Sequence, residues 1–431
     1  MHLRPYQSAA IAAVANGYAA GFRGVMLVMP TGAGKTVVFT RLAQETGRIL
    51  IVVPRIELVA QTRYKLWRYG VRHGVIAAGS RDVDSGARVQ VAMAQTLVRR
   101  AALVLDFDLV ILDECHLAAS DTYRKILTRC GNARILAVTA TPFRLDGQGF
   151  GHFASALVCG PSVADLTALG SLVPAITYSV PTVDLSNLTR SKGEFDAGAF
   201  ETGITGDVVA HYQRLAQARQ AIVFAASVKH ADKLRAEFVA AGIAAATVTG
   251  ETPSHDRAIL LQLLHNGTLQ VICNYGVLTE GFDCPPVSAI VIARATTSCA
   301  LWIQMAGRGL RPSVGKANCI LLDHGGNACR HGGIEYEREY SLQGAKVKAP
   351  NEGTLAKVCT LCAAVMPVTA KVCPVCGLVP AVEPRPEPKR RAGELQAMAA
   401  GTAPVKLPSW QSLTRDAVQR GQALAQRGRD A

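Results

Sequence analysis

Acidic residues are scarce in this sequence, and so are aromatic residues and long apolar runs. Asp and Glu number 32 against 46 Lys and Arg among 431 residues, which gives a formal net charge of +14 at pH 7. The shortage of negative charge excludes strong repulsion of polyanions and favours nucleic acid as a partner. On charge alone, a basic protein without such a partner is a nearly equal interpretation.

An apolar export signal is also missing, because the first residues read MHLRPYQSAA. The uncharged stretch 166–183 contains two prolines and several hydroxyl groups, which argues against a membrane span. We therefore expect a cytoplasmic protein without a membrane partner. Its 12 cysteines are then expected to be thiols or metal ligands rather than disulfides.

What is present is a repeating order of short apolar runs and helix-like stretches. Five such runs lie between residues 25 and 139, and five more lie between 221 and 323. Strands that alternate with helices predict βαβ units and a parallel sheet. The expected fold class is therefore α/β, with two tandem parallel-sheet domains.

The remaining segments predict a linker and small C-terminal parts. Residues 171–205 are assigned to a linker because they contain prolines and show little periodicity. The expected divisions are 1–170 for the first domain, 171–205 for the linker, 206–345 for the second domain, 355–380 for a cysteine module that binds zinc, and 381–431 for a basic linker and tail helix.

The run MPTGAGKT predicts a phosphate-binding loop between a strand and a helix, although the general pattern has glycine where Met29 stands. Backbone N–H groups of the loop and of the helix N-terminus can surround a phosphate. Gly32 and Gly34 allow backbone angles that a Cβ would forbid. Lys35 adds positive charge for the β- and γ-phosphates, and Thr36 adds a hydroxyl ligand for Mg²⁺.

The run LVILDECH predicts a second part of the same site. Asp113 lies at the tip of an apolar strand, where its carboxylate can hold Mg²⁺, and Glu114 can orient the attacking water. An acidic pair that caps the next helix is the alternative. Thr139 and Thr141, in TATP, could link this site to the second domain or form an ordinary turn. The amide of Gln7 can pair with N6 and N7 of adenine, although an isolated glutamine is most often a surface residue.

Six motifs occur in the order and spacing of superfamily 2 helicases, namely PTGAGKT, VPRIELVAQT, LDECH, TATPFR, VLTEGFDCP and QMAGRGLRP. The chain thus resembles the DEAD/DEAH-box-type ATP-dependent helicases over about residues 1–325. More narrowly, LRPYQ, TGETP, LLDHGGN and the late cysteines are similar to the bacterial RadD-type DNA repair helicases and their phage relatives. The resemblance explains Met29, because these helicases commonly have Pro-Thr-Gly at this point of the loop.

The resemblance implies two RecA-like domains that hydrolyse ATP between them. The implied catalytic residues are Lys35, Asp113, Glu114, Gln304, Arg308 and Arg311. One of the two arginines would be the finger that faces the γ-phosphate, with solvated surface charge as the alternative role. The implied nucleotide-binding residues are Arg4, Gln7, Thr31, Gly32, Ala33, Gly34, Lys35, Thr36, Asp113, Gly281 and Asp283.

The resemblance also implies a nucleic-acid track whose contacts go mostly to phosphate and therefore do not read sequence. Its residues are Pro54, Arg55, Gln61, Gln95, Thr96, Thr249, Gly250 and Thr279. Thr139 and Thr141 are implied to couple hydrolysis to movement. For each track residue, a capping or turn role is the alternative.

Two CxxC pairs predict a structural zinc site, because each pair presents two sulfurs on a tight turn. The expected ligands are Cys359, Cys362, Cys373 and Cys376, and a redox pair is the alternative. His324, Cys329 and His331 have irregular spacing and are expected to be loop residues rather than metal ligands. The module and the tail are expected to grip DNA or, alternatively, to dock a protein partner.

The expected function is that of an ATP-dependent helicase or translocase, acting on single-stranded or branched DNA in repair, recombination or replication. ATP, Mg²⁺ and a structural Zn²⁺ are the expected cofactors. An RNA helicase is one alternative, and an ATP-switched DNA-binding clamp without strand separation is another. No nuclease constellation and no obvious wedge element is visible in the sequence.

Overall fold

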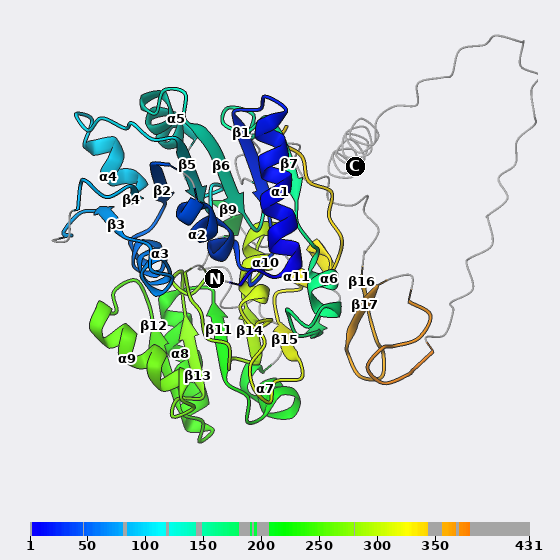
Figure 1. Ribbon diagram of the computed structural model, residues 1–431. Helices are drawn as coiled ribbons and strands as arrows, with labels where there is room; N and C mark the ends of the chain where they lie inside the picture. The colour runs from blue at the N-terminus through cyan, green and yellow to red at the C-terminus, as the bar shows by residue number, and fades with distance from the viewer. Residues whose placement is uncertain are drawn as a thin grey trace, which may run out of the picture. The chain divides into compact units, whose positions relative to one another are not determined.

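Two parallel β-sheets with helices packed on them form the main body of the chain (Figure 1). Residues 1–380 form one compact unit, and the second unit, residues 381–431, lies outside the described residues together with the tail helix expected there. The computed structural model describes residues 2–45, 47–80, 84–117, 120–143, 149–180, 190–191, 194–195, 207–279, 281–343, 356–367 and 370–379.

The first sheet has seven strands, and every pairing within it is parallel. Its strands are, in spatial order, β3 (His73–Ile76), β4 (Val89–Met93), β2 (Ile49–Val53), β5 (Leu109–Asp113), β6 (Arg134–Thr139), β1 (Gly24–Val28) and β7 (Ala156–Cys159). Parallel strands need crossover connections. The helices of this part are α1 (Pro5–Ala19), α2 (Lys35–Glu45), α3 (Ile56–Arg68), α4 (Ala94–Arg99), α5 (Ser120–Arg129) and α6 (Val163–Ala168).

The second sheet has six parallel strands. They are, in spatial order, β12 (Ala245–Val248), β13 (Val271–Asn274), β11 (Ala221–Ala225), β14 (Ala289–Ala293), β15 (Cys319–Asp323) and β8 (Ala175–Ser179). Its helices are α7 (Val208–Ala216), α8 (Val228–Ala240), α9 (Ser254–His265), α10 (Cys299–Gly307) and α11 (Asn327–His331). The expected α/β class with two tandem RecA-like sheets is therefore confirmed.

The central strands are apolar throughout because both faces of each sheet are covered. In β2, Ile49, Ile51 and Val53 belong to one apolar cluster, whereas Leu50 and Val52 belong to the cluster on the opposite face. This is the alternation that a strand imposes on its side chains. The first of these clusters continues from the first sheet into the second, so the two sheets share part of their core.

The expected linker 171–205 contains regular structure at its start, which corrects the sequence-based division. β8 pairs with β15 and forms an edge strand of the second sheet. Pro174 precedes this strand, and a proline is tolerated at the start of an edge strand, where its missing N–H costs no ladder hydrogen bond. Farther along, β9 (Arg190–Ser191) and β10 (Glu194–Phe195) form a short antiparallel pair. The rest of the expected linker lies outside the described residues.

The cysteine module forms a small antiparallel pair, β16 (Ala356–Val358) and β17 (Val365–Pro367). A β-bridge joins Ala364 of the module to Tyr178 of β8, so the module lies against the edge of the second sheet. Among the described residues, no helix is both long and apolar enough to cross a membrane.

Candidate nucleotide-binding site

The loop after β1 keeps Met29 within the sheet rather than in the phosphate cradle. Its N–H donates to the carbonyl of Thr139 at 3.0 Å, which continues the ladder between β1 and β6. Its side chain is fully buried, and a Cβ built on Gly160 would come within 2.9 Å of the Met29 Cγ. Met29, at the position that is glycine in other phosphate loops, therefore extends the hydrogen bonds of β1 and packs in the apolar core.

The two glycines of the loop are required by conformation and by space. Gly32 and Gly34 have φ angles of +89° and +87°, which side chains rarely adopt. A Cβ on Gly34 would also lie 2.4 Å from Nε2 of Gln7. Lys35 then begins α2, so the loop leads directly into a helix N-terminus. Such a terminus favours a phosphate group.

Gln7 is buried and binds the loop itself. Its Nε2 donates to the Ala33 carbonyl at 3.1 Å, and its Oε1 accepts from the N–H of Arg4 at 3.0 Å. The hydroxyl of Tyr6 donates to the same Ala33 carbonyl at 3.1 Å. An amide has two N–H donors and an oxygen with two lone pairs, so one donor and one acceptor of Gln7 stay available for a base edge.

An acidic pair stands at the carboxyl end of β5, close to the lysine of the loop. Lys35 Nζ lies 3.5 Å from Glu114 Oε1, and both side chains are largely buried. Glu114 has a φ of +45°, an unusual angle for a residue with a side chain. Its N–H donates to Asp113 Oδ1 at 3.1 Å. The carboxylates are thus held side by side next to one cation.

Burial affects the two carboxyl groups differently. Burial, and then the charge of Glu114, raise the pKa of Asp113 to about 7. Burial would also raise the pKa of Glu114, but nearby Lys35, His116 and Arg308 outweigh it and lower that pKa. At neutral pH the shared negative charge therefore lies mainly on Glu114.

The raised pKa of Asp113 indicates a buried carboxylate with too little positive charge around it. A divalent cation would supply that charge. Oxygen ligands such as a carboxylate and the hydroxyl of Thr36 are those that Mg²⁺ prefers. The residues present therefore fit a magnesium ion.

A chain of polar groups leads from the acidic pair to the second sheet. His116 Nδ1 lies 2.8 Å from Thr139 Oγ1 and 3.6 Å from Glu114 Oε2. His116 Nε2 lies 2.8 Å from Gln304 Nε2, which belongs to α10. Thr139 Oγ1 also accepts from the N–H of Thr141 at 2.9 Å.

The two arginines after α10 are held by the loop that follows β13. Arg308 is buried and donates to the carbonyls of Thr279 and Phe282 at 2.6–3.0 Å. Arg311 Nη1 donates to the Phe282 carbonyl at 3.0 Å and lies 3.0 Å from Asp283 Oδ1. These contacts rule out the alternative of freely solvated surface charge for both side chains.

The same region packs directly on the phosphate loop. A Cβ on Gly307 would lie 3.0 Å from the Thr31 Cβ, and a Cβ on Gly32 would lie 3.5 Å from the Arg311 Cγ. A Cβ on Gly281 would come within 3.3 Å of Leu58 in α3. Glycines at these points let the two sheets approach closely around the loop.

The structure brings part of the expected nucleic-acid track together at the start of α3. Arg55 donates to the Gly276 carbonyl at 3.5 Å, a long contact. Arg257 of α9 bridges Glu57 at 3.2 Å and the Thr249 carbonyl at 3.1 Å. Thr279 lies against Arg308, as described above. Among the described residues, no hydrogen bond or ion pair links the side chains of the other expected residues to these partners; they are Pro54, Gln61, Gln95, Thr96 and Gly250.

Lys65 was not singled out by any motif, yet it lies among the charged groups of this site. Burial lowers the pKa of Lys65. The positive charges of Arg311 and Lys35 lower it further, and the negative charges of Asp283 and Asp113 oppose the shift. Lys65 lies three residues beyond the motif VPRIELVAQT, on the helix that this motif begins. Helical spacing from Gln61, four residues earlier, is the only sequence signal that could have indicated it.

A second network that sequence reasoning missed involves the run LLDHGGN. Asn327 accepts from the N–H of Thr296 at 2.8 Å, and donates to the Arg294 carbonyl and to Asp323 Oδ1, each at 2.8 Å. Thr296 Oγ1 in turn accepts from the N–H of Ser298 at 2.9 Å, and Ser298 caps α10. The network thus fixes the start of the helix that carries Gln304.

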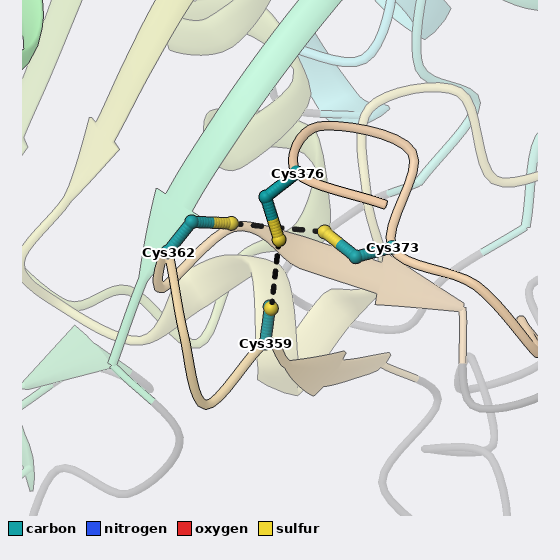
Figure 2. Close-up of side chains that lie close together, drawn as sticks. All are labelled: Cys359, Cys362, Cys373 and Cys376. Atoms are coloured by element: carbon teal, nitrogen blue, oxygen red, sulfur yellow. Dashed lines mark hydrogen bonds between the residues drawn. The ribbon is translucent and has the colours of Figure 1, made fainter. Parts of the chain in front are cut away.

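The four cysteines of the small module converge on one point (Figure 2). Their sulfur atoms all lie within 4.8 Å of one another, with 3.6 Å between Cys359 and Cys376 and between Cys362 and Cys373. A tetrahedral Zn²⁺ with bonds of about 2.3 Å requires sulfur separations of about 3.8 Å. The donor set and its size therefore fit zinc.

The residues expected not to bind metal have other contacts. His324 stacks on His211 with ring centroids 5.2 Å apart, and His331 Nε2 lies 2.8 Å from the Thr296 carbonyl. Cys329 lies 4.0 Å from the Ser179 hydroxyl. In the part of the chain that the structure describes, the four-cysteine group is the one cluster with the geometry of a metal site.

Two family descriptions match parts of this chain. Residues 1–144 match the family described as "Type III restriction enzyme, res subunit", and residues 207–313 match the "Helicase conserved C-terminal domain". A fragment of a putative HsdR subunit of a type I restriction enzyme from Vibrio vulnificus YJ016 superposes with a TM-score of 0.60 at 22% identity. That similarity covers 78% of this chain and 67% of the fragment, and concerns the fold.

Proteins of similar sequence include the following three. A "51.5 kDa protein" of Lactococcus phage (isolate 7-9) is 30% identical over 89% of this chain and 84% of its own. The putative mitochondrial ATP-dependent helicase irc3 of Schizosaccharomyces pombe is 31% identical over 75% of this chain. The DNA 3'-5' translocase XPB2 of Sulfurisphaera tokodaii is 32% identical over 38% of it. The chain spans only 57% of the yeast protein and 35% of the translocase.

Proposed function

The chain belongs to the superfamily 2 helicases, ATP-hydrolysing enzymes, and from that premise we propose that it is a motor that moves along DNA. The observation that carries the proposal is the contact between His116 and Gln304 at 2.8 Å. It connects the acidic pair beneath the phosphate loop to the helix that leads to Arg308 and Arg311. A change at the γ-phosphate can therefore reach the second sheet through one hydrogen bond.

In the proposed reaction, the phosphate loop and Lys35 hold the β- and γ-phosphates, and Gln7 with Arg4 nearby selects adenine. Thr36 and Asp113 hold Mg²⁺, which when bound neutralises charge on the phosphates. Glu114 Oε2 accepts no hydrogen bond from the described residues, so it is available to orient the attacking water and take its proton.

We propose that Arg308 or Arg311 supplies positive charge to the transferring phosphoryl group. An arginine at this point is worth about 10³–10⁵ in rate in other phosphoryl-transfer enzymes. Arg308 donates to the carbonyls of Thr279 and Phe282, and Arg311 donates to the carbonyl of Phe282, next to Asp283. Their movement towards the nucleotide would therefore release the loop that follows β13, which carries the track residue Thr279.

DNA is the proposed track, in repair, recombination or replication. The formal charge of +14 suits a polyanion. The relative XPB2 is named a DNA 3'-5' translocase, which supports DNA over RNA. Since phosphate contacts dominate such tracks, an RNA helicase is the competing outcome.

The test is ATP hydrolysis with single-stranded DNA, duplex DNA and RNA side by side, followed by strand displacement on the best activator. We expect DNA to stimulate hydrolysis most, and Lys35→Ala and Glu114→Gln to lower kcat by about 10²–10⁴-fold. Lys229→Ala, at an exposed lysine of α8, is the matched control and should hydrolyse normally. Stimulation by RNA alone would contradict the DNA assignment, and normal hydrolysis by Glu114→Gln would contradict the assigned base.

A further inference from the structure

The outer face of α3 carries an apolar stripe where a surface helix ordinarily has polar residues. Ile56, Tyr64 and Trp67 are 47%, 58% and 70% exposed, respectively. Their spacing places them on one side of the helix. The opposite side of α3 packs Leu58 and Leu66 into the core, so this helix is apolar on both faces.

Two aromatic rings dominate this stripe. The ring centroids of Tyr64 and Trp67 lie 6.0 Å apart with planes inclined at 33°. The rings support each other from successive turns of the same helix while most of their surface faces solvent. A rigid, exposed aromatic pair is a surface on which the flat face of a nucleobase can stack.

The charges around the rings are positive. Arg63 and Arg68 lie on the same helix, whose only acidic residue is Glu57. Glu57 is 3.2 Å from Arg257 and is therefore already paired. This charge distribution complements a phosphate backbone. An apolar protein partner would suit the stripe, but it would have no need for the two cationic neighbours.

The stripe also continues from the expected nucleic-acid track. Arg55 precedes the first turn of α3, and Arg257 connects that turn to Thr249. Trp67 lies twelve residues after Arg55, or about 18 Å along the helix axis at 1.5 Å per residue. A strand that leaves the track along α3 would therefore reach both rings.

We propose that Tyr64 and Trp67 form a stacking platform for the unpaired bases of single-stranded DNA at one end of the track. The proposal rests on the proposed function. Paired bases cannot present their faces, so the platform binds a separated strand better than a duplex. It thereby supplies the element for holding strands apart that the sequence alone did not reveal.

The test measures binding of single-stranded and duplex DNA of equal length across a salt series, for wild type, Tyr64→Ala, Trp67→Ala and Trp67→Phe. Since stacking is worth about 1–3 kcal/mol per base, Trp67→Ala should weaken single-strand binding by about 5- to 150-fold. Its salt dependence should keep the wild-type slope, because no phosphate contact is lost. Trp67→Phe should retain most of the affinity but lose the fluorescence quenching that stacking on tryptophan causes.

Phe22→Ala is the matched control, because Phe22 is 42% exposed and lies in the turn after α1. The platform would be overturned if Tyr64→Ala and Trp67→Ala both kept the wild-type affinity for single-stranded DNA and the DNA-stimulated hydrolysis. The motor would then remain, and this face would be assigned to a protein partner. A wild-type protein that binds no DNA and is not stimulated by it would overturn the proposed function, and the platform with it.

Discussion

Asp113 lies where an ionised carboxylate costs stability, because it is buried next to Glu114 and the charges of Lys35 and Lys65 offset this only in part. Its raised pKa of about 7 means that the folded protein binds a proton more tightly than the unfolded chain does. The associated stability is fully present below the ordinary aspartate pKa and is lost as the pH rises to about 7. This destabilising arrangement is expected where a residue is kept for its chemistry.

We therefore expect Asp113→Asn to raise the free energy of unfolding at pH 8, without Mg²⁺, by on the order of 1–3 kcal/mol. The gain should shrink towards pH 5, where the wild-type carboxyl is protonated in the folded state. Urea unfolding at the two pH values measures it. Asp121→Asn, at an exposed residue paired with Arg124, is the control and should show no such trend. A destabilised Asp113→Asn protein at pH 8 would contradict this electrostatic account, and the variant should in any case lose ATP hydrolysis.

At the residue scale, local motifs were enough to predict where Lys35, Asp113 and Glu114 meet, because the carboxyl ends of all parallel strands in one sheet share one edge. They were not enough for Lys65 or Asn327. The environment of Lys65 is built from charged groups on several distant segments, and Asn327 gains its role only when β14 lies beside β15. Such positions depend on packing that no single stretch of sequence contains.

At the element scale, β8 shows why the domain division was only partly predictable. Its five residues lie between prolines and are joined by bonds to β15, a strand about 140 residues later in the chain. The sequence pattern of a short edge strand resembles that of a linker. Its pairing with β15, and the bridge to the cysteine module, appear only in the fold.

The cysteine module is thus a structural neighbour of the second sheet. Ala364 bridges to Tyr178, and Tyr178 packs against the small core around Cys359 and Cys373. Backbone hydrogen bonds, that from Cys376 foremost, lower the pKa of Cys373 to about 6, which suits a thiolate ligand. A zinc site with four protein ligands has no open coordination position, so it stabilises the fold and takes no part in catalysis.

Removal of zinc with a zinc-selective chelator, in excess Mg²⁺, should therefore loosen β8 as well as the module. We expect amide hydrogen exchange to rise by at least about tenfold in residues 175–179, which corresponds to a local loss of about 1.4 kcal/mol. Exchange in β5 of the first sheet is the internal control. Cys373→Ser should reproduce the effect without chelator. If amide exchange rose in the module but not in β8, the bridge between Ala364 and Tyr178 would contribute nothing measurable to the stability of β8.

At the scale of the whole molecule, one apolar cluster extends across both sheets, while polar contacts surround the phosphate loop. A motor needs this combination, because the lobes must stay associated and yet shift relative to each other at each cycle. The polar groups around the phosphate loop can change their hydrogen-bond partners when the lobes shift. Among the described residues, His116 with Gln304 is the one that joins the acidic motif directly to α10.

We expect Gln304→Ala and His116→Ala to uncouple the two lobes without removing the nucleotide. A hydrogen bond contributes about 0.5–1.5 kcal/mol net, so DNA-stimulated kcat should fall by about 3- to 10-fold with little change in the KM for ATP. Steady-state hydrolysis with and without single-stranded DNA separates these effects, and His255→Ala, at an exposed histidine of α9, is the matched control. A double variant should be no worse than either single one, because both remove the same bond. Additive losses would show that His116 acts through Glu114 rather than through Gln304, and the path between the lobes would then have to run through Arg308.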